Sequence, residues 1–229
     1  NAQYIVGSIK SYDDLAIVSY IAQIVRPHTL RMYLISPFIM GQRSDRPFTE
    51  RASFGFKYIA DQINYCQFDE VFILDAHSDV IPALINNCTS HSIEIALNQI
   101  DIDWKNVIMV SPDAGAYKKS KKIADTVGCM LIPAVKVRLE DGTPEVKIMG
   151  DVAGRDIVII DDIYDGGRTF ESLSIQLKQL DAKSVNLIIS HGLFSRGVEV
   201  PESIDLIYTT TSFRTAEELK HDKIKIIKI

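Results

Sequence analysis

The sequence predicts an α/β protein built on mostly parallel β-sheets, and three observations support this prediction. Short apolar runs alternate along the 229 residues with stretches whose apolar side chains recur at helical spacing. The apolar runs are rich in Val, Ile and Leu and are bounded by turn-forming residues, as strands covered on both faces are. Two of the runs end in an acid, at Asp75 and Asp161. Alternation of this kind is typical of parallel strands joined through helices.

In chain order, the apolar runs predict strands at residues 30–35, 71–74, 107–110, 130–135, 157–160, 185–189 and 206–208. Helices are expected at residues 14–26, 52–63 and 170–180, where apolar side chains recur every three or four residues. The stretch at residues 117–122 holds four lysines. It is interpreted as the solvated face of a helix, with attraction of an anion as the alternative.

The runs that end at Asp75 and Asp161 share one pattern, because each is followed by a polar loop and then by a further helix-like segment. We interpret this repeat as two related α/β lobes, at residues 1–90 and 91–229. The alternative is that the similarity reflects only the general α/β pattern. At 229 residues, the chain has the length of one domain or of two small ones.

The composition excludes several classes of protein. Hydrophobic residues make up 46% and charged residues 24%, which is enough apolar surface to exclude disorder as the main state. Lys and Arg total 25 against 30 Asp and Glu, so the net charge of −5 provides no general attraction for nucleic acid. The three scattered cysteines, with no CxxC pair, indicate a reducing compartment. Because no apolar run approaches the ~20 residues that span a bilayer, we expect a cytoplasmic protein without a membrane or nucleic-acid partner.

The most informative stretch covers residues 157–169, where an apolar strand runs directly into Asp161 and Asp162, and Asp165 follows. Ligands of open α/β sheets bind beyond the carboxyl ends of the strands. Adjacent carboxylates at such a strand end suit ribose hydroxyls or a hard metal ion. The alternative is a simple turn that carries acids for solubility, but a buried strand ending in two acids is otherwise costly.

Two glycines, Gly166 and Gly167, follow these acids and precede Arg168 and Thr169 at the start of the expected helix. Glycine lets the backbone approach a ligand closely and turn its N–H groups toward it. A helix N-terminus favours an anion. The segment is therefore interpreted as a phosphate-binding loop. The chain has no G-x-x-x-x-G-K-[ST] run, which disfavours a P-loop kinase.

The Asp-Asp-x-x-Asp pattern, with small residues and Thr after it, resembles the phosphoribosyl-diphosphate loop of type I phosphoribosyltransferases and of ribose-phosphate diphosphokinases, the PRPP synthetases. Further segments, in family order, favour the diphosphokinases. They are residues 41–46 (Gly-Gln-Arg-Ser-Asp-Arg), 74–78 (Leu-Asp-Ala-His-Ser), 111–115 (Ser-Pro-Asp-Ala-Gly), 136–138 (Lys-Val-Arg), 150–156 (Gly-Asp-Val-Ala-Gly-Arg-Asp) and 191–195 (His-Gly-Leu-Phe-Ser).

The resemblance implies two related type I phosphoribosyltransferase-like lobes and an ATP-dependent diphosphoryl transfer to the C1 hydroxyl of ribose 5-phosphate, with release of AMP. It implies a catalytic role for Lys136 and Arg138 on an extended loop, with residues 140–144 as a mobile lid. It implies Mg²⁺ at His77 and Asp113, and a homodimer or higher homo-oligomer. ATP is expected at Arg43, Ser44, Asp45, Arg46 and His77, and the ribose phosphate at Asp161, Asp162, Asp165, Gly166, Gly167, Arg168 and Thr169.

The chain departs from the family pattern in the phosphate loop, which usually runs Asp-Thr-(Ala/Gly)-Gly-Thr. Here a hydroxyl residue is replaced by Gly166 and a glycine by Arg168. The lost hydroxyl removes a contact worth about 1 kcal/mol to a charged ligand, and the arginine adds a fixed positive charge. We therefore expect an acceptor larger than ribose 5-phosphate, with ADP-ribose as the candidate ester.

Two other interpretations remain open. A type I phosphoribosyltransferase would share the phosphate loop but has no use for Lys136 and Arg138. A non-catalytic regulatory homologue of PRPP synthetase is the alternative from another class. The family also has N-terminal residues before the segment that matches residues 4–26, and the chain opens at Asn1 without them. We therefore expect the first lobe to lack its opening segment.

Overall fold

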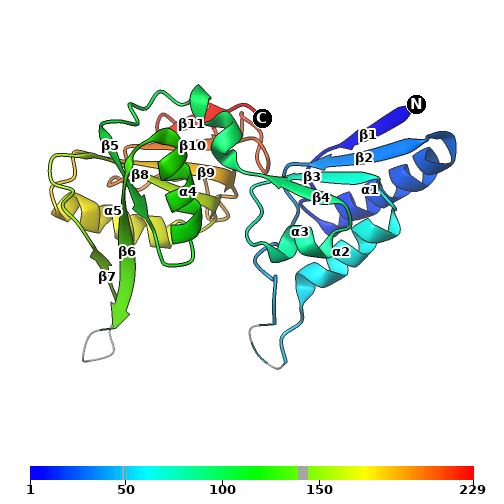
Figure 1. The fold of residues 1–229 in the computed structure, drawn as a ribbon, viewed down its shortest axis with the longest axis horizontal. Helices are drawn as coiled ribbons and strands as arrows, with labels where there is room; N and C mark the ends of the chain where they lie inside the picture. Colours follow the sequence, from blue (N-terminus) through cyan, green and yellow to red (C-terminus); the bar gives the residue numbers. More distant parts are fainter. Residues whose placement is uncertain (48, 50, 139–143) are drawn as a thin grey trace. The chain divides into compact units, whose positions relative to one another are not determined.

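The computed structural model describes residues 1–47, 49, 51–138 and 144–229 and divides into two compact units, Asn1–Ile95 and Ala96–Ile229 (Figure 1). Each unit has its own sheet and its own hydrophobic core, which confirms the predicted α/β fold. The expected boundary at residue 90 falls inside β4 (Cys88–His91), which pairs with β3 (Glu70–Leu74) of the first sheet. Because β4 belongs to that sheet, the first unit extends to Ile95.

The first unit is built on a four-stranded parallel sheet in the order β1-β2-β3-β4. In addition to β3 and β4, it contains β1 (Ala2–Val6), α1 (Tyr12–Val25), the 3-10 helix η1 (Arg26–His28), β2 (Arg31–Ser36), α2 (Gly55–Tyr65) and α3 (Val80–Leu84). A second 3-10 helix, η2 (Ile93–Gln99), crosses the boundary between the units. Parallel pairing brings the carboxyl ends of all four strands to one edge of this sheet.

Helix α1 begins two residues before its expected start because Ser11 caps it. The Ser11 hydroxyl accepts a hydrogen bond of 3.1 Å from the Asp14 backbone N–H, which satisfies one of the free donors of the first turn. Leu15, Val18 and Ala22 form the buried face of the helix, as the helical spacing predicts. Ile21, which also recurs at helical spacing in this segment, is 39% exposed because it lies at the edge of that stripe.

The second unit is built on a seven-stranded sheet in the order β11-β10-β9-β8-β5-β6-β7, in which only the β6–β7 pair is antiparallel. Its elements are β5 (Val107–Ser111), α4 (Tyr117–Val127), β6 (Met130–Arg138), β7 (Pro144–Ile148), β8 (Asp156–Tyr164), α5 (Arg168–Gln179), β9 (Ser184–Gly192), β10 (Leu206–Thr210) and β11 (Ile224–Ile227). In the part of the chain that the structure describes, no helix is both long and apolar enough to span a membrane.

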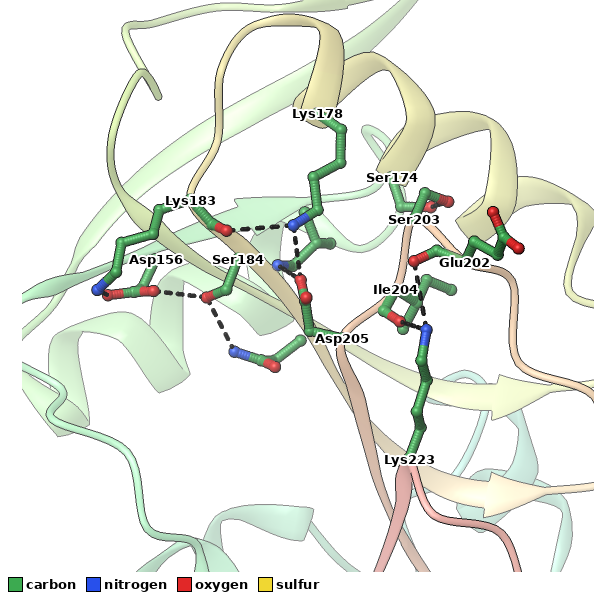
Figure 2. A network of polar contacts seen from close by, with 12 residues as sticks. Asp156, Ser174, Lys178, Lys183, Ser184, Glu202, Ser203, Ile204, Asp205 and Lys223 are labelled. Atoms are coloured by element: carbon green, nitrogen blue, oxygen red, sulfur yellow. Dashed lines mark hydrogen bonds and ion pairs between the residues drawn. The ribbon is translucent and has the colours of Figure 1, made fainter.

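A network of paired charges lies at the amino ends of β8 and β9 (Figure 2). The Lys183 ammonium is 2.8 Å from a carboxylate oxygen of Asp156, and the Ser184 hydroxyl donates a hydrogen bond of 2.6 Å to the other oxygen. These contacts, with the Lys183 contact the stronger, hold the pKa of Asp156 below its usual value. Lys178 is paired in the same way with Asp205, at 2.8 Å. At this end of the sheet, Asp156 and Asp205 are therefore each paired with a lysine.

Candidate functional site

The two adjacent acids of the predicted phosphate site lie within β8, which continues four residues past the expected end at Ile160. Asp162 is buried, and its backbone N–H donates a hydrogen bond of 2.9 Å to Oδ1 of Asp161. Strand β8 lies between β5 and β9 in the sheet, so its carboxyl end is flanked by parallel strands on both sides. The sequence predicts the acids at the carboxyl end of a strand, the edge at which ligands of open α/β sheets bind. The structure has them at this end of a central strand.

Asp162 perturbs the ionisation of Asp161. Burial and, after it, the nearby charge of Asp162 raise the pKa of Asp161 well above its usual range. The Lys119 ammonium acts in the opposite direction, so at least this lysine of the run at residues 117–122 faces the site rather than only solvent. A partly buried carboxyl pair of this kind would be stabilised by a cation or by ligand hydroxyl groups that donate hydrogen bonds to it.

The glycine loop connects these acids to α5. Gly167 is the residue before the helix and has left-handed backbone angles, φ 73° and ψ −11°, which glycine adopts without strain. The N-cap residue, Gly167, has no side chain with which to cap the N-terminus of α5, and Arg168 and Thr169 in its first turn are exposed. The free N–H groups and the helix dipole make this end of α5 suitable for a phosphate group.

The Tyr164 side chain packs against the phosphate loop. Its buried ring stacks on Phe170 of α5 at a centroid distance of 5.5 Å and packs against Phe194 at 4.7 Å. The Tyr164 carbonyl accepts hydrogen bonds from the backbone N–H groups of Leu193 (2.8 Å) and Phe194 (3.2 Å). A Cβ atom on Gly167 would lie only 2.8 Å from Cζ of Tyr164, so the ring requires glycine at that position. The phosphate loop is thus packed against the segment that follows β9.

Arg196, in that segment, is a site residue that the sequence analysis missed. Its guanidinium lies beside Gly166, where a Cβ atom would be 3.2 Å from Nε of Arg196. The neighbouring stretch at residues 191–195 resembles a family segment, but nothing in the local sequence shows that the next side chain reaches the phosphate loop.

Asp113 lies in the turn between β5 and α4. Its Oδ1 accepts a hydrogen bond of 3.0 Å from the Ala116 N–H, and its carbonyl accepts one of 2.8 Å from the Ser111 hydroxyl. Asp113 belongs to the second unit, and His77, the other residue of the predicted metal site, belongs to the first. Within the described residues, no three or more His, Cys, Asp or Glu side chains gather as a metal site would require. The His77–Asp113 metal pair stays a prediction.

The predicted catalytic residues lie on a hairpin rather than on the extended loop that we expected. Strand β6 continues to Arg138, and its last residues pair with antiparallel β7, Lys136 opposite Val146 and Arg138 opposite Pro144. Antiparallel pairing in this register accounts for the difference, because it extends the strand past its apolar part. The predicted lid lies at residues 140–143, outside the described residues, apart from its last residue, Pro144.

In the first unit, the structure brings the two predicted ATP-binding segments together. The His77 backbone N–H donates a hydrogen bond of 3.0 Å to the Gln42 side chain. Asp45 is buried and paired with Arg46, whose Nε and Nη2 atoms lie 2.9 and 3.0 Å from its two oxygens. This pairing, with smaller contributions from Ser78 and His77, lowers the pKa of Asp45 to about 2.

Of the other predicted ATP-binding residues, Arg43 and Ser44 lie in the same turn and are exposed. The Ser44 backbone N–H donates a hydrogen bond of 2.8 Å to the Gly41 carbonyl, which closes the turn. Asp75, at the end of β3, is buried and has a left-handed φ of 47°. This backbone conformation redirects the chain toward His77 at the carboxyl edge of the first sheet.

Comparison with known proteins identifies the class to which this chain belongs. Residues 80–222 match the phosphoribosyl transferase domain family. A ribose-phosphate pyrophosphokinase of Corynebacterium efficiens is 33% identical over 173 residues, which cover 72% of this chain and 53% of the relative. A ribose-phosphate pyrophosphokinase of Rhizobium meliloti is 30% identical over 209 residues, which cover 85% of this chain and 67% of the relative.

A solved structure shares the fold of the whole chain. The crystal structure of phosphoribosylpyrophosphate synthetase from Mycobacterium smegmatis superimposes with a TM-score of 0.84 at 21% identity, covering 99% of this chain and 78% of that one. The fold and the domain match define a phosphoribosyl transferase domain protein. Within that class, the chain belongs to the ribose-phosphate pyrophosphokinase family, as the resemblance predicted. It spans 53% and 57% of the length of two of its curated relatives.

Proposed function

We propose that this protein is an ATP-dependent diphosphokinase that transfers the β,γ-diphosphoryl group of ATP to the C1 hydroxyl of a ribose phosphate and releases AMP. The observation that supports this most strongly is the Asp161–Asp162 pair, with Asp162 buried and Asp161 partly buried, followed by a glycine loop that leads into the N-terminus of α5. The carboxyl groups are suited to accept hydrogen bonds from ribose hydroxyls. The loop N–H groups are suited to donate to the phosphate.

The nucleotide is proposed to bind in the first unit, at the turn that holds Arg43, Ser44, Asp45 and Arg46 and at the neighbouring His77. The support is the contact between these segments, in which Gln42 and Asp45 face the residues that follow β3. Arginine guanidinium groups bind phosphate oxygens and stack on aromatic rings such as adenine. The Asp45–Arg46 pair fixes the Arg46 side chain in one orientation, which reduces the entropy lost on binding.

A magnesium ion is part of this proposal because phosphoryl transfer from ATP concentrates negative charge on the phosphate oxygens. The oxygen donors of Asp113 and of the Asp161–Asp162 pair suit a hard cation of this kind. We assign His77 and Asp113 as the residues that hold it, as the resemblance implies. When bound, the ion neutralises charge on the transferring group and positions the phosphates.

Lys136 and Arg138 are proposed to stabilise the diphosphoryl group during transfer. Removing one hydrogen-bond donor that is directed at developing negative charge typically costs about 10²–10³-fold in kcat. Lys136→Ala should therefore reduce AMP formation by about two orders of magnitude or more without loss of folding. Lys225→Ala, an exposed lysine on the edge strand β11, is the matched control and should leave the rate unchanged.

The test is an assay of AMP formation from ATP and Mg²⁺ with either ribose 5-phosphate or ADP-ribose as acceptor. We expect AMP with ADP-ribose and little or none with ribose 5-phosphate, because the loop lacks a hydroxyl at Gly166 and carries Arg168. Rapid turnover of ribose 5-phosphate would contradict the preference for an ester. Absence of AMP with every ribose phosphate would contradict the diphosphokinase itself and favour a regulatory homologue.

A further inference from the structure

The glycine at position 166 is not required by the backbone. Among the two loop glycines, only Gly167 has a positive φ, whereas Gly166 has backbone angles that other residues adopt. What a side chain at position 166 would meet is Arg196. An added Cβ would lie 3.2 Å from its Nε and 3.6 Å from its Cδ and Cζ atoms. Gly166 therefore leaves space that the Arg196 guanidinium uses.

Arg196 projects from a turn that is held firmly against the loop. Phe194 is fully buried with a left-handed φ of 48°, and the Gly197 N–H donates a hydrogen bond of 3.0 Å to its carbonyl. Arg214 donates from Nε to the Leu193 carbonyl (2.7 Å) and from Nη2 to the Phe194 carbonyl (3.1 Å). Since the N–H groups of these two residues also bond to Tyr164, the turn is anchored on both sides.

The Arg196 side chain is also available to a ligand. It is exposed, and it forms no hydrogen bond or ion pair with any residue that the structure describes. Arg168 contributes a second exposed guanidinium in the first turn of α5. The glycine loop thus has the backbone N–H groups of a helix N-terminus at its centre and two exposed arginines from different segments beside it, an arrangement that can contact two phosphate groups.

We propose that Gly166 and Arg196 together form a specificity element for a ribose whose 5-phosphate carries a second phosphate. The inner phosphate binds to the loop N–H groups, and the Arg196 guanidinium binds oxygens of the outer phosphate by a two-pronged contact. This inference rests on the proposed function and narrows its acceptor to diphosphate esters of ribose, such as ADP-ribose. A terminal phosphate monoester has no outer group for Arg196 to bind.

The test is calorimetric binding of ADP-ribose and of ribose 5-phosphate to the whole chain in the absence of ATP, so that the readout does not depend on turnover. Arg196→Ala should weaken ADP-ribose binding about tenfold or more, as expected for a lost charge-assisted hydrogen bond. It should weaken ribose 5-phosphate binding less than threefold. Arg196→Lys should restore only part of the loss, because lysine lacks the planar fork.

Gly166→Val tests the other half of the element, since it fills the space without adding a hydrogen-bonding group. It should displace the guanidinium and reproduce the Arg196→Ala loss for ADP-ribose, and the double variant should bind no more weakly than either single variant. Arg155→Ala removes an exposed arginine just before the amino end of β8 and should change neither affinity. Thermal unfolding of each variant shows whether a loss of affinity reflects a loss of folding.

Several outcomes would overturn the proposal: equal losses for both ligands in Arg196→Ala, no loss for either, or a wild-type chain that binds no ADP-ribose. These outcomes are distinguishable from failure of the proposed function. Arg196-dependent binding of ADP-ribose without any AMP release would support the specificity element and contradict the diphosphokinase. AMP release with affinities that do not depend on Arg196 would support the diphosphokinase and contradict the specificity element.

Discussion

The pKa values of the acidic side chains Asp156 and Asp161, at the amino and carboxyl ends of the second sheet, are shifted in opposite directions. At the amino ends, Asp156 is paired with Lys183 and Ser184, and its pKa is lowered (Figure 2). At the carboxyl ends, Asp161 lies beside a second carboxyl group, Asp162, and its pKa is raised. The paired charges stabilise the fold, whereas the carboxyl pair is held at a cost to the fold that the proposed ligand would offset. This contrast supports the proposal that the carboxyl ends are the functional edge.

The largest effect should come from the tight packing of the phosphate loop. Gly167→Ala places a Cβ atom 2.8 Å from Tyr164 Cζ at a position with left-handed backbone angles. The backbone strain and the clash together should lower the free energy of unfolding by about 3 kcal/mol, measured by urea denaturation.

Gly154→Ala is the matched control for that variant. Gly154 also has a positive φ, of 67°, but an added Cβ there would meet nothing within 4 Å. Its cost should be about 1 kcal/mol, from the backbone alone. Equal costs for Gly154→Ala and Gly167→Ala would contradict the supporting role given to Tyr164.

The second effect concerns the acidic pair at the carboxyl ends. The raised pKa of Asp161 means that the folded state loses stability as pH rises from about 4, where unfolded carboxyl groups ionise, toward that raised pKa. Asp162→Asn removes the neighbouring charge, so it should be more stable than the wild type at pH 8 by roughly 1 kcal/mol. The difference should vanish near pH 3, and AMP formation should fall. A destabilised Asp162→Asn at pH 8 would contradict this account.

The smallest effect is expected at the amino ends of the second sheet. There, replacing the carboxyl group should lower the stability of the fold rather than raise it. Because the pKa of Asp156 is lowered, its pairing stabilises the fold above the usual carboxyl pKa, and this stabilisation is lost as pH falls. Asp156→Asn should therefore be less stable than the wild type at pH 7 by at most about 1 kcal/mol, since the partly exposed pair is screened by solvent. Thermal unfolding should show that the difference in stability between Asp156→Asn and the wild type is smaller at pH 3 than at pH 7. AMP formation should be unaffected.

Sequence reasoning located the central strands of both sheets but missed strands at their edges. The predicted strands β5 and β8 lie in the middle of the second sheet and read as apolar runs because both faces are covered. Among the described residues, the strands that the sequence did not predict are β1, β4, β7 and β11, and each lies at an edge of its sheet. In β1, only Ile5 is buried, so its sequence carries no clear apolar run. Their pairing depends on neighbouring strands that are distant in sequence.

The same distinction applies to the site. Asp161, Asp162 and the glycine loop are contiguous in the chain, so their pattern could be interpreted without a structure. Arg196 could not be found in this way. Its position beside Gly166 depends on the left-handed turn at Phe194 and on the hydrogen bonds from Arg214. Likewise, the influence of Lys119 on Asp161 follows from the folding of α4 onto the site.

The most direct test of the contrast between the two ends is hydrogen–deuterium exchange of the backbone amides with and without ADP-ribose. We expect slower exchange on ligand addition at residues 166–169 and 193–197, around the phosphate loop. Exchange at the amino end of β9, from Ser184 to Val185, should stay the same. No added protection at the loop, or protection confined to the amino ends, would contradict the assignment of the carboxyl edge as the ligand site.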